Sequence, residues 1–169
     1  CATTVVHADF KDVPQDAVYA DSVNSLSSMG IMPGTGKDAY SPKDIVTREQ
    51  FAVIMVKASG LEDEAISLKG ATMFSDVKPG SANSGYIAEA SAKGFVSGLP
   101  DSRFHPGDQI NFGQVCSAVV KALGYTGQDV AGRWPNNYIN KALKLELTED
   151  INLKATDGVP RWALALIID

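Results

Sequence analysis

The chain has 169 residues, enough for one compact domain or two small ones. Hydrophobic residues make up 44% of it and charged residues 21%, which is the composition of a globular protein and excludes a disordered chain. The net charge of −5 argues against a nucleic-acid-binding protein, because such proteins usually present a basic face. No apolar run approaches the roughly 20 residues of a membrane-spanning helix, so no membrane span is predicted.

The N-terminal segment and the two cysteines give further expectations. Residues 1–8 are small and apolar and are predicted to be the remnant of a secretory signal peptide or a disordered extension. Cys116 lies in an apolar helical pattern and is predicted to be a small buried residue. Two distant cysteines form neither a disulfide framework nor a zinc-ligand spacing, so neither a metal nor a cofactor is predicted.

An internal repeat is the strongest signal in the sequence. Shifting the chain by 64 positions, from Phe10 to Phe74, brings many identical or similar residues into register without a gap. The further matched pairs are Asp12 with Asp76, Gly30 with Gly94, Gly34 with Gly98, Tyr40 with Phe104, Pro42 with Pro106, Val46 with Ile110, and Gln50 with Gln114. The expected repeats are residues 9–69, residues 70–128, and a divergent or truncated third repeat over residues 129–169.

In chain order, each complete copy begins with a helix that ends at a glycine, which accepts the left-handed backbone after the last turn. The expected inward residues and final glycines are Val23, Leu26 and Gly30 in the first copy and Ile87, Ala90 and Gly94 in the second. Asp12 and Asp76 recur at matched positions before these helices. This recurrence fits a binding role, and capping of an early helical turn explains it about as well.

A second helix follows in each copy. Thr47 with Gln50, and Asn111 with Gln114, have the spacing of a capping box at its start. The spacing of apolar residues predicts one buried stripe in each copy, namely Phe51, Ile54, Met55 and Ala58, and then Val115, Ala118, Val119 and Ala122. The acidic residues 62–64 are expected to form a solvated linker face.

The third copy is divergent. Its expected first helix carries Tyr138, Ile139, Ala142, Leu143 and Leu147. Its second helix is expected to begin near Pro160 and to bury Leu164, Ile167 and Ile168. No stretch shows the alternation of a strand, so the predicted fold is all-α, built from three helix-loop-helix repeats.

The first copy carries four motif segments: Phe10-x-Asp12-Val13, Gly30-Ile31-x-x-Gly34, Tyr40-x-Pro42, and Val46-Thr47-Arg48-Glu49-Gln50-Phe51-Ala52. Together they resemble an S-layer homology (SLH) repeat, and the resemblance extends over nearly the whole chain from Phe10 onward. It implies a pseudo-threefold, trident-like helical domain. Its inter-repeat grooves would bind secondary cell-wall polysaccharide, commonly bearing pyruvate ketals on an amino sugar. It also implies a secreted, non-catalytic module that anchors a protein at the bacterial cell wall or S-layer.

The same resemblance marks an arginine as the ligand contact, namely Arg48 and, by weaker alignment, Arg161. A guanidinium can meet a carboxylate with two parallel hydrogen bonds, and free N–H groups at a helix start also favour an anion. The full set of predicted ligand-binding residues is Arg48, Arg161, Gly34, Gly98, Thr47, Glu49 and Trp162. Phe112 stands where the second copy would have this arginine, so that groove is expected to have lost its clamp or to use other residues.

No catalytic residue is predicted. His7 lies in the N-terminal segment, and His105 has no obvious acidic partner in the sequence. Two alternatives to polysaccharide binding stay open. Degenerate repeats could serve protein–protein contact or S-layer lattice assembly, or the module could bind peptidoglycan directly.

Overall fold

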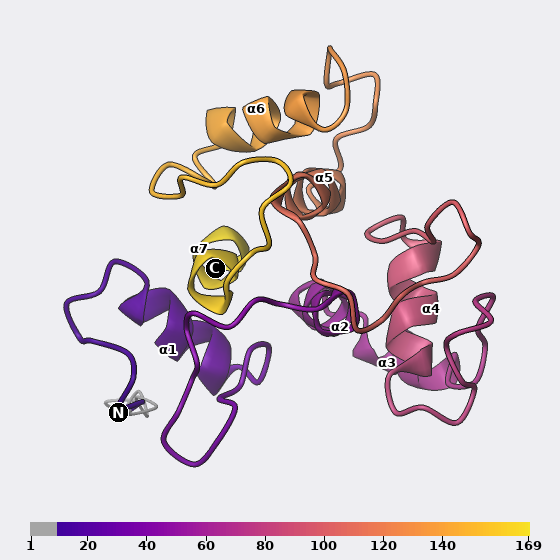
Figure 1. Cartoon of the computed structure of the whole chain (residues 1–169), viewed down its shortest axis with the longest axis horizontal. Helices are drawn as coiled ribbons and strands as arrows, with labels where there is room; N and C mark the ends of the chain where they lie inside the picture. The colour runs from indigo at the N-terminus through magenta and orange to yellow at the C-terminus, as the bar shows by residue number, and fades with distance from the viewer. Residues whose placement is uncertain (1–9) are drawn as a thin grey trace, which may run out of the picture. The chain divides into compact units, whose positions relative to one another are not determined.

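The computed structural model describes residues 10–169, so the predicted signal remnant and His7 lie outside the described residues. The described residues form seven helices: α1 (Ala20–Ser28), α2 (Arg48–Ala58), α3 (Glu62–Ser67), α4 (Ser84–Ala92), α5 (Phe112–Ala122), α6 (Asn136–Lys144) and α7 (Arg161–Ile168) (Figure 1). Instead of strands, residues 10–169 hold two isolated backbone bridges, Thr47 with Gln109 and Asn111 with Gly158. The all-α expectation is confirmed. In this part of the chain, no helix has the length and apolar character that a membrane crossing requires.

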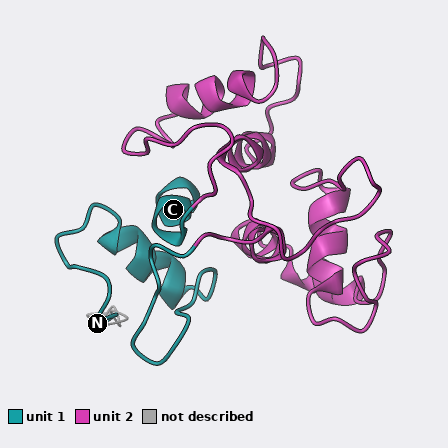
Figure 2. Cartoon of the chain, in the orientation of Figure 1, with its two compact units in different colours: residues 1–44, 160–169 teal, residues 45–159 magenta. Residues whose placement is uncertain are grey.

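The chain divides into two compact units (Figure 2). Among the described residues, the first joins residues 10–44 with residues 160–169, and in it α7 packs on α1. The second comprises residues 45–159, where α4 packs on α2 and α3, and α6 packs on α5. Each packed pair therefore joins helices from different sequence repeats. The exact repeat boundaries and the trident arrangement stay predictions.

Local signals place the helix ends where they were expected. In the first capping box, Gln50 N donates to Thr47 Oγ1 at 3.2 Å, and Thr47 N donates to the Gln50 side chain at 3.0 Å. Asn111 and Gln114 form the same reciprocal pair at the start of α5. Gly30 follows α1 with a φ of 71°, in the left-handed region that glycine adopts without strain.

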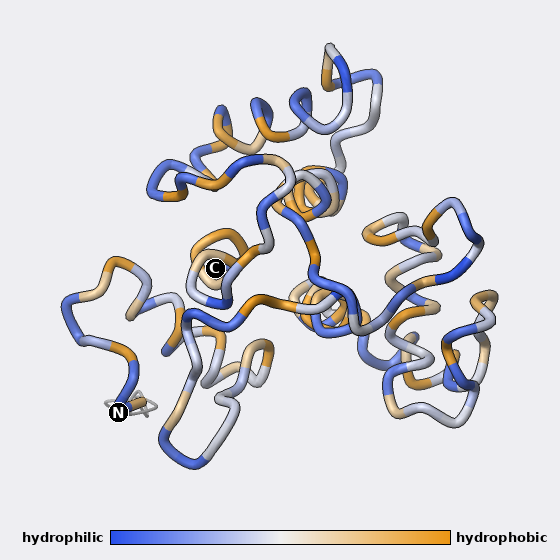
Figure 3. Tube along the Cα trace, viewed as in Figure 1, coloured by the Kyte–Doolittle hydropathy of each residue, from blue (hydrophilic) through white to orange (hydrophobic). Residues whose placement is uncertain are grey.

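The buried faces differ in detail from the predicted stripes. Helices α5 and α7 are apolar along most of their length (Figure 3), and residues 115–120 of α5 are all buried. The stripe prediction is wrong at Ala58 and Ala122, which are exposed because each is the last residue of its helix. It is also wrong at Leu143, which is 52% exposed, and Leu147 lies beyond the end of α6.

Helix α3 is an element that the sequence pattern does not predict. The acidic residues 62–64 are exposed, as expected, but they belong to a six-residue helix instead of a linker. Ala65 is buried on its other side, and a Cβ atom on Gly85 of α4 would overlap the backbone carbonyl of Ala65. The close approach of α3 to α4 therefore depends on glycine at position 85. A six-residue helix is too short to show a period.

Three backbone segments, one from each predicted repeat, close a ring of hydrogen bonds inside the second unit. Ile110 N donates to the Val46 carbonyl at 3.0 Å, Val159 N donates to the Ile110 carbonyl at 3.1 Å, and Val46 N donates to the Val159 carbonyl at 2.9 Å. All three side chains are buried. The ring holds the chain at the residues that directly precede the Thr47 and Asn111 caps, and so it positions the starts of α2 and α5.

Candidate ligand groove

Arg48, the first residue of α2, holds the loop between α4 and α5. Its Nε donates to the Phe104 carbonyl at 2.8 Å, and its Nη2 donates to the Ser97 carbonyl at 2.6 Å. The guanidinium carbon lies 4.7 Å from the centre of the Phe104 ring, and the residue is only 3% exposed. Burial lowers the pKa of Arg48, and the charges of Asp108 and Asp76 oppose that shift.

Asp76 binds the backbone of the same loop. Its carboxylate accepts hydrogen bonds from Phe104 N at 2.9 Å and from His105 N at 2.7 Å. Burial raises the pKa of this carboxyl group. The two N–H donors lower the pKa by more than burial raises it, so the pKa lies below its ordinary value. Asp12 binds two successive N–H groups of the first unit in the same way, at 2.8 and 2.7 Å. The interpretation that these aspartates cap helices is wrong, because their donors lie on distant loops.

The backbone N–H groups at the start of α2 are already bonded. Arg48 N donates to the Asp108 carbonyl at 2.8 Å, and Glu49 N donates to the Pro106 carbonyl at 3.1 Å. The following N–H group is taken by the Thr47 hydroxyl. The expectation of free N–H groups that would favour an anion here is therefore wrong, because the loop before α5 folds over the helix start.

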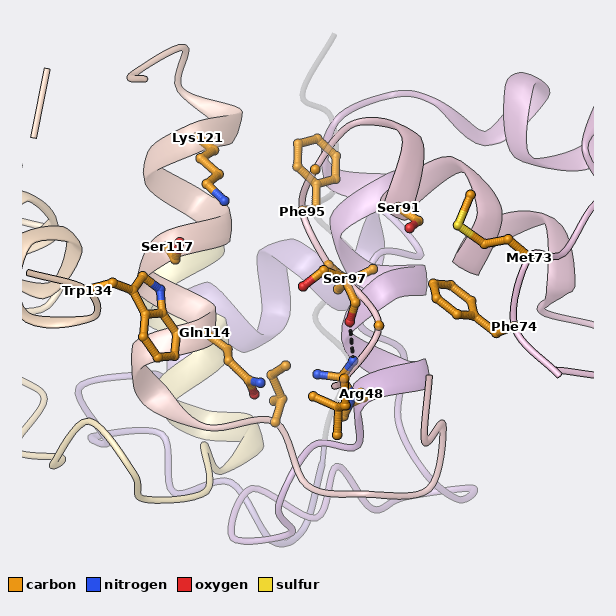
Figure 4. A pocket seen from close by; sticks show the side chains of 15 residues that line it. Arg48, Met73, Phe74, Ser91, Phe95, Ser97, Gln114, Ser117, Lys121 and Trp134 are labelled. Carbon is orange, nitrogen blue, oxygen red and sulfur yellow. Dashed lines mark hydrogen bonds between the residues drawn. The ribbon is translucent and has the colours of Figure 1, made fainter. Parts of the chain in front are cut away.

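A groove of about 510 Å³ lies beside Arg48 in the second unit (Figure 4). One wall is the loop after α4, with Phe95, Ser97 and Gly98. The facing wall comes from α5 and the segment after it, with Gln114, Ser117, Lys121 and Trp134. Two of the fifteen described residues that line this groove are cations, Arg48 and Lys121, and none is a carboxylate. The groove therefore favours an anionic ligand.

Both predicted binding glycines are required by packing. A Cβ atom on Gly98 would lie 2.7 Å from the Phe74 ring. A Cβ atom on Gly34, in the first unit, would lie 2.5 Å from the Phe10 ring and 2.8 Å from the Ala39 carbonyl oxygen. Of the two, Gly98 also lines the groove.

Arg161, the first residue of α7, repeats the arrangement of Arg48 inside the first unit. Its Nε donates to the Tyr40 carbonyl at 2.8 Å, and its Nη2 donates to the Pro33 carbonyl at 2.7 Å. The guanidinium lies 4.4 Å from the centre of the Tyr40 ring, and the residue is 7% exposed. Arg48 and Arg161 thus have the same contacts, although only Arg48 has the full sequence motif around it.

Thr47, Glu49 and Trp162 are not among the residues that line the groove. Thr47 caps α2, while Glu49 borders a separate cavity of about 160 Å³. The second residue of α2, α5 and α7 faces the residue directly before the partner helix. Glu49 contacts Asn83, Trp162 contacts Tyr19, and a Cβ atom on Gly113 would lie 2.7 Å from the Pro135 side chain. The contact is a hydrogen bond of 3.1 Å in the first case and a ring contact of 5.8 Å in the second. This position therefore serves packing of the helix pairs.

His105 has two acidic neighbours, so the expectation that it has none is wrong. Its Nε2 lies 2.6 Å from Asp101 Oδ2, and its Nδ1 lies 3.6 Å from Asp108 Oδ2. Cys116 is buried, as predicted, and burial raises the pKa of its thiol to about 12. A thiol in that state is a poor nucleophile.

No sequence motif points to Lys121 and Trp134 as groove residues. Lys121 matches Lys57 at the repeat offset, which marks it as part of the repeat but not as a binding residue. Trp134 has no such match, because the third repeat diverges in this segment. The two residues are 13 positions apart, from 121 to 134, and only the packing of the chain brings them to one groove.

The family model described as S-layer homology domain matches residues 9–52 and 74–116, a span that contains Arg48 and Gly98. The chain is 34% identical over 146 residues to a middle cell wall protein of Brevibacillus brevis, covering 85% of this chain and 14% of that protein. It is 33% identical over 137 residues to a surface layer protein of Brevibacillus choshinensis, covering 81% of this chain and 12% of that protein. It is also 31% identical over 124 residues to an amylopullulanase of Thermoanaerobacterium thermosulfurigenes, covering 70% of this chain and 6% of that protein. The chain thus spans 14% or less of the length of these three relatives.

Proposed function

Because the chain belongs to the S-layer homology domain family, we propose that it anchors a longer protein by binding an anionic polysaccharide of the cell wall in the groove beside Arg48. The family match confirms the resemblance drawn from the sequence. Together with the cell-wall and surface-layer relatives, it also confirms the expected location at the bacterial cell surface. The ligand that we propose is a secondary cell-wall polysaccharide whose amino sugar carries a pyruvate ketal.

The charge of the groove is the observation that supports this ligand. Over the whole chain, acidic residues outnumber basic ones by 20 to 15. The groove reverses this balance, because Arg48 and Lys121 line it and no lining residue is acidic. A cleft lined by one sign of charge concentrates ligands of the opposite sign. The carboxylate of a pyruvate ketal supplies such a charge on an otherwise neutral sugar.

The predicted binding residues have different parts in this proposal. Arg48 keeps one terminal nitrogen, Nη1, that has no hydrogen bond to the described residues, and we assign this atom to the ligand. Gly98 lines the groove and, having no side chain, lets a sugar approach the backbone of the loop wall. Thr47 and Glu49 support the site indirectly, because Thr47 caps α2 and Glu49 binds Asn83 directly before α4. Arg161, Gly34 and Trp162 have packing roles inside the first unit.

The anchoring part is proposed to be non-catalytic. One relative is an amylopullulanase, and the similarity covers only 6% of it. The module is therefore an accessory part that an enzyme or a surface protein can carry. Lattice assembly between copies of such a module and direct binding to peptidoglycan are the competing functions.

A sedimentation assay with purified Gram-positive sacculi separates these functions. The whole chain is incubated with sacculi before and after their secondary polysaccharide is removed. Binding that disappears on removal and weakens as salt is added supports the proposal, because salt screens the ion pairs. Equal binding to both preparations indicates peptidoglycan. A folded chain that binds neither preparation and associates with itself in sedimentation velocity would leave lattice assembly as the function.

A further inference from the structure

The guanidinium of Arg48 is largely committed to the protein itself. Its Nε and Nη2 donate to the Phe104 and Ser97 carbonyls. These two atoms form one of the donor pairs through which an arginine binds a carboxylate with two hydrogen bonds, so that pair is already occupied. The residue is 3% exposed, which leaves little of it within reach of a ligand. Another side chain must therefore meet most of the ligand's charge.

We propose that Lys121 and Trp134 determine which sugar the groove accepts: the Lys121 ammonium pairs with the ligand's carboxylate, and the Trp134 indole stacks on its ring. This assignment rests on the function proposed above and names the residues that carry it. Arg48 then has a smaller share of the ligand, through Nη1 alone, and holds the opposite wall through Nε and Nη2.

Lys121 is a cation without a carboxylate partner among the described residues. It is exposed on α5, and in Figure 4 its ammonium points into the groove. Its ammonium also lies over the Tyr138 ring, 5.6 Å from Nζ to the ring centre. Its counterpart Lys57 differs, because Glu62 of α3 lies 3.9 Å from the Lys57 ammonium. The residue that matches Glu62 after α5 is Thr126, so the charge of Lys121 is not neutralised in this way.

Trp134 supplies a flat apolar surface on the same wall. It is 58% exposed, and its indole N–H makes no hydrogen bond within the described part of the chain. Figure 4 shows its ring beside Gln114, on the α5 side of the groove. An exposed indole is an amphipathic surface that fits the apolar face of a pyranose ring while its N–H meets a hydroxyl group. A stacking surface and a cation on one wall match a sugar that carries a carboxylate.

Isothermal titration calorimetry on the whole chain tests the two roles with two probes. One probe is the methyl glycoside of an N-acetylhexosamine that carries a pyruvate ketal, and the other is the same glycoside without the ketal. Lys121→Gln should weaken binding of the ketal probe about fivefold and flatten its salt dependence. It should leave the probe without the ketal unaffected. Trp134→Leu should weaken both probes about tenfold, whereas Trp134→Phe should keep most of the affinity.

Lys144→Gln is the matched control, since it makes the same charge change at an exposed residue of α6 that does not line the groove. It should bind both probes as the wild type does. If the wild type binds the ketal probe and Lys121→Gln and Trp134→Leu keep its affinity and salt dependence, the assignment of these two residues is wrong and the proposed function stands. If the wild type binds neither probe, the proposed ligand chemistry fails, and this assignment fails with it.

Discussion

Arg161 and Tyr40 are 121 positions apart in the sequence, yet the Arg161 Nε donates a hydrogen bond of 2.8 Å to the Tyr40 carbonyl. Within the second unit, Arg48 Nε makes the same bond of 2.8 Å to the Phe104 carbonyl. In both cases the first residue of one helix binds the loop that follows its partner helix. The buried arginine therefore ties a helix pair together, whatever else it binds.

Replacing Arg48 by alanine should destabilise the second unit. The Phe104 and Ser97 carbonyls would each lose a charged donor, at a combined cost of about 3 kcal/mol in the free energy of unfolding. Arg48→Lys should recover less than half of this, because an ammonium cannot reproduce the planar fork. Urea unfolding followed by circular dichroism measures the change. Arg103→Ala is the control, because its side chain on the same loop is 52% exposed and should cost about 0.5 kcal/mol or less. Equal losses for Arg48→Ala and Arg103→Ala would show that the guanidinium of Arg48 does not hold the loop.

Acid should unfold the protein partly through Asp12 and Asp76. The pKa of each carboxyl group lies below its ordinary value in the folded chain, so the unfolded chain binds a proton more readily. The stability that they contribute is present above about pH 4 and is lost as the pH falls through the folded pKa values. Thermal unfolding midpoints measured against pH should therefore drop below that point. Asp76→Asn should be less stable than the wild type at neutral pH and should lose less on acidification. An unchanged acid slope in the variant would exclude Asp76 as a contributor.

Gly98→Ala tests whether packing requires glycine at the groove wall. The added Cβ would lie 2.7 Å from the Phe74 ring, and the shift of the loop needed to relieve that contact should cost about 2 kcal/mol. Gly107→Ala is the matched control in the loop that leads into α5, because its Cβ would meet nothing within 4 Å. Chemical unfolding compares the two variants. A Gly98→Ala protein as stable as Gly107→Ala would mean that the Phe74 ring moves aside easily.

Gly85→Ala should separate α3 from α4. A Cβ atom there overlaps the Ala65 carbonyl, a backbone atom that cannot move by itself. We expect a loss of about 3 kcal/mol in unfolding free energy and faster limited proteolysis around residues 62–67. Gly80→Ala, whose Cβ would meet open space, should behave like the wild type in both measurements. Proteolysis at the wild-type rate in Gly85→Ala would show that α3 does not depend on this contact.

Several local predictions hold because their cause lies within one helical turn. The Thr47–Gln50 and Asn111–Gln114 caps and the glycine after α1 involve residues at most a few positions apart, so the sequence pattern contains the whole interaction. Helix α3 is missed because six residues show no period. The helix starts were expected to offer N–H groups to an anion, but the partners of those groups lie on another loop.

The repeat, the all-α class, the capped helix starts and the family can be predicted from the amino-acid sequence, because each is carried by short-range spacing or by many matches at one offset. The folded chain is needed to show which helices pair, what Asp76 and Arg48 bind, and that Lys121 and Trp134 line one groove. The partners in these contacts lie 28 positions away for Asp76 and 56 for Arg48. Bringing such distant residues together is driven by burial of the helix faces, which is non-directional and roughly proportional to apolar area. The spacing of residues along the chain therefore predicts which faces are buried, but it does not specify which loop each buried polar group will meet.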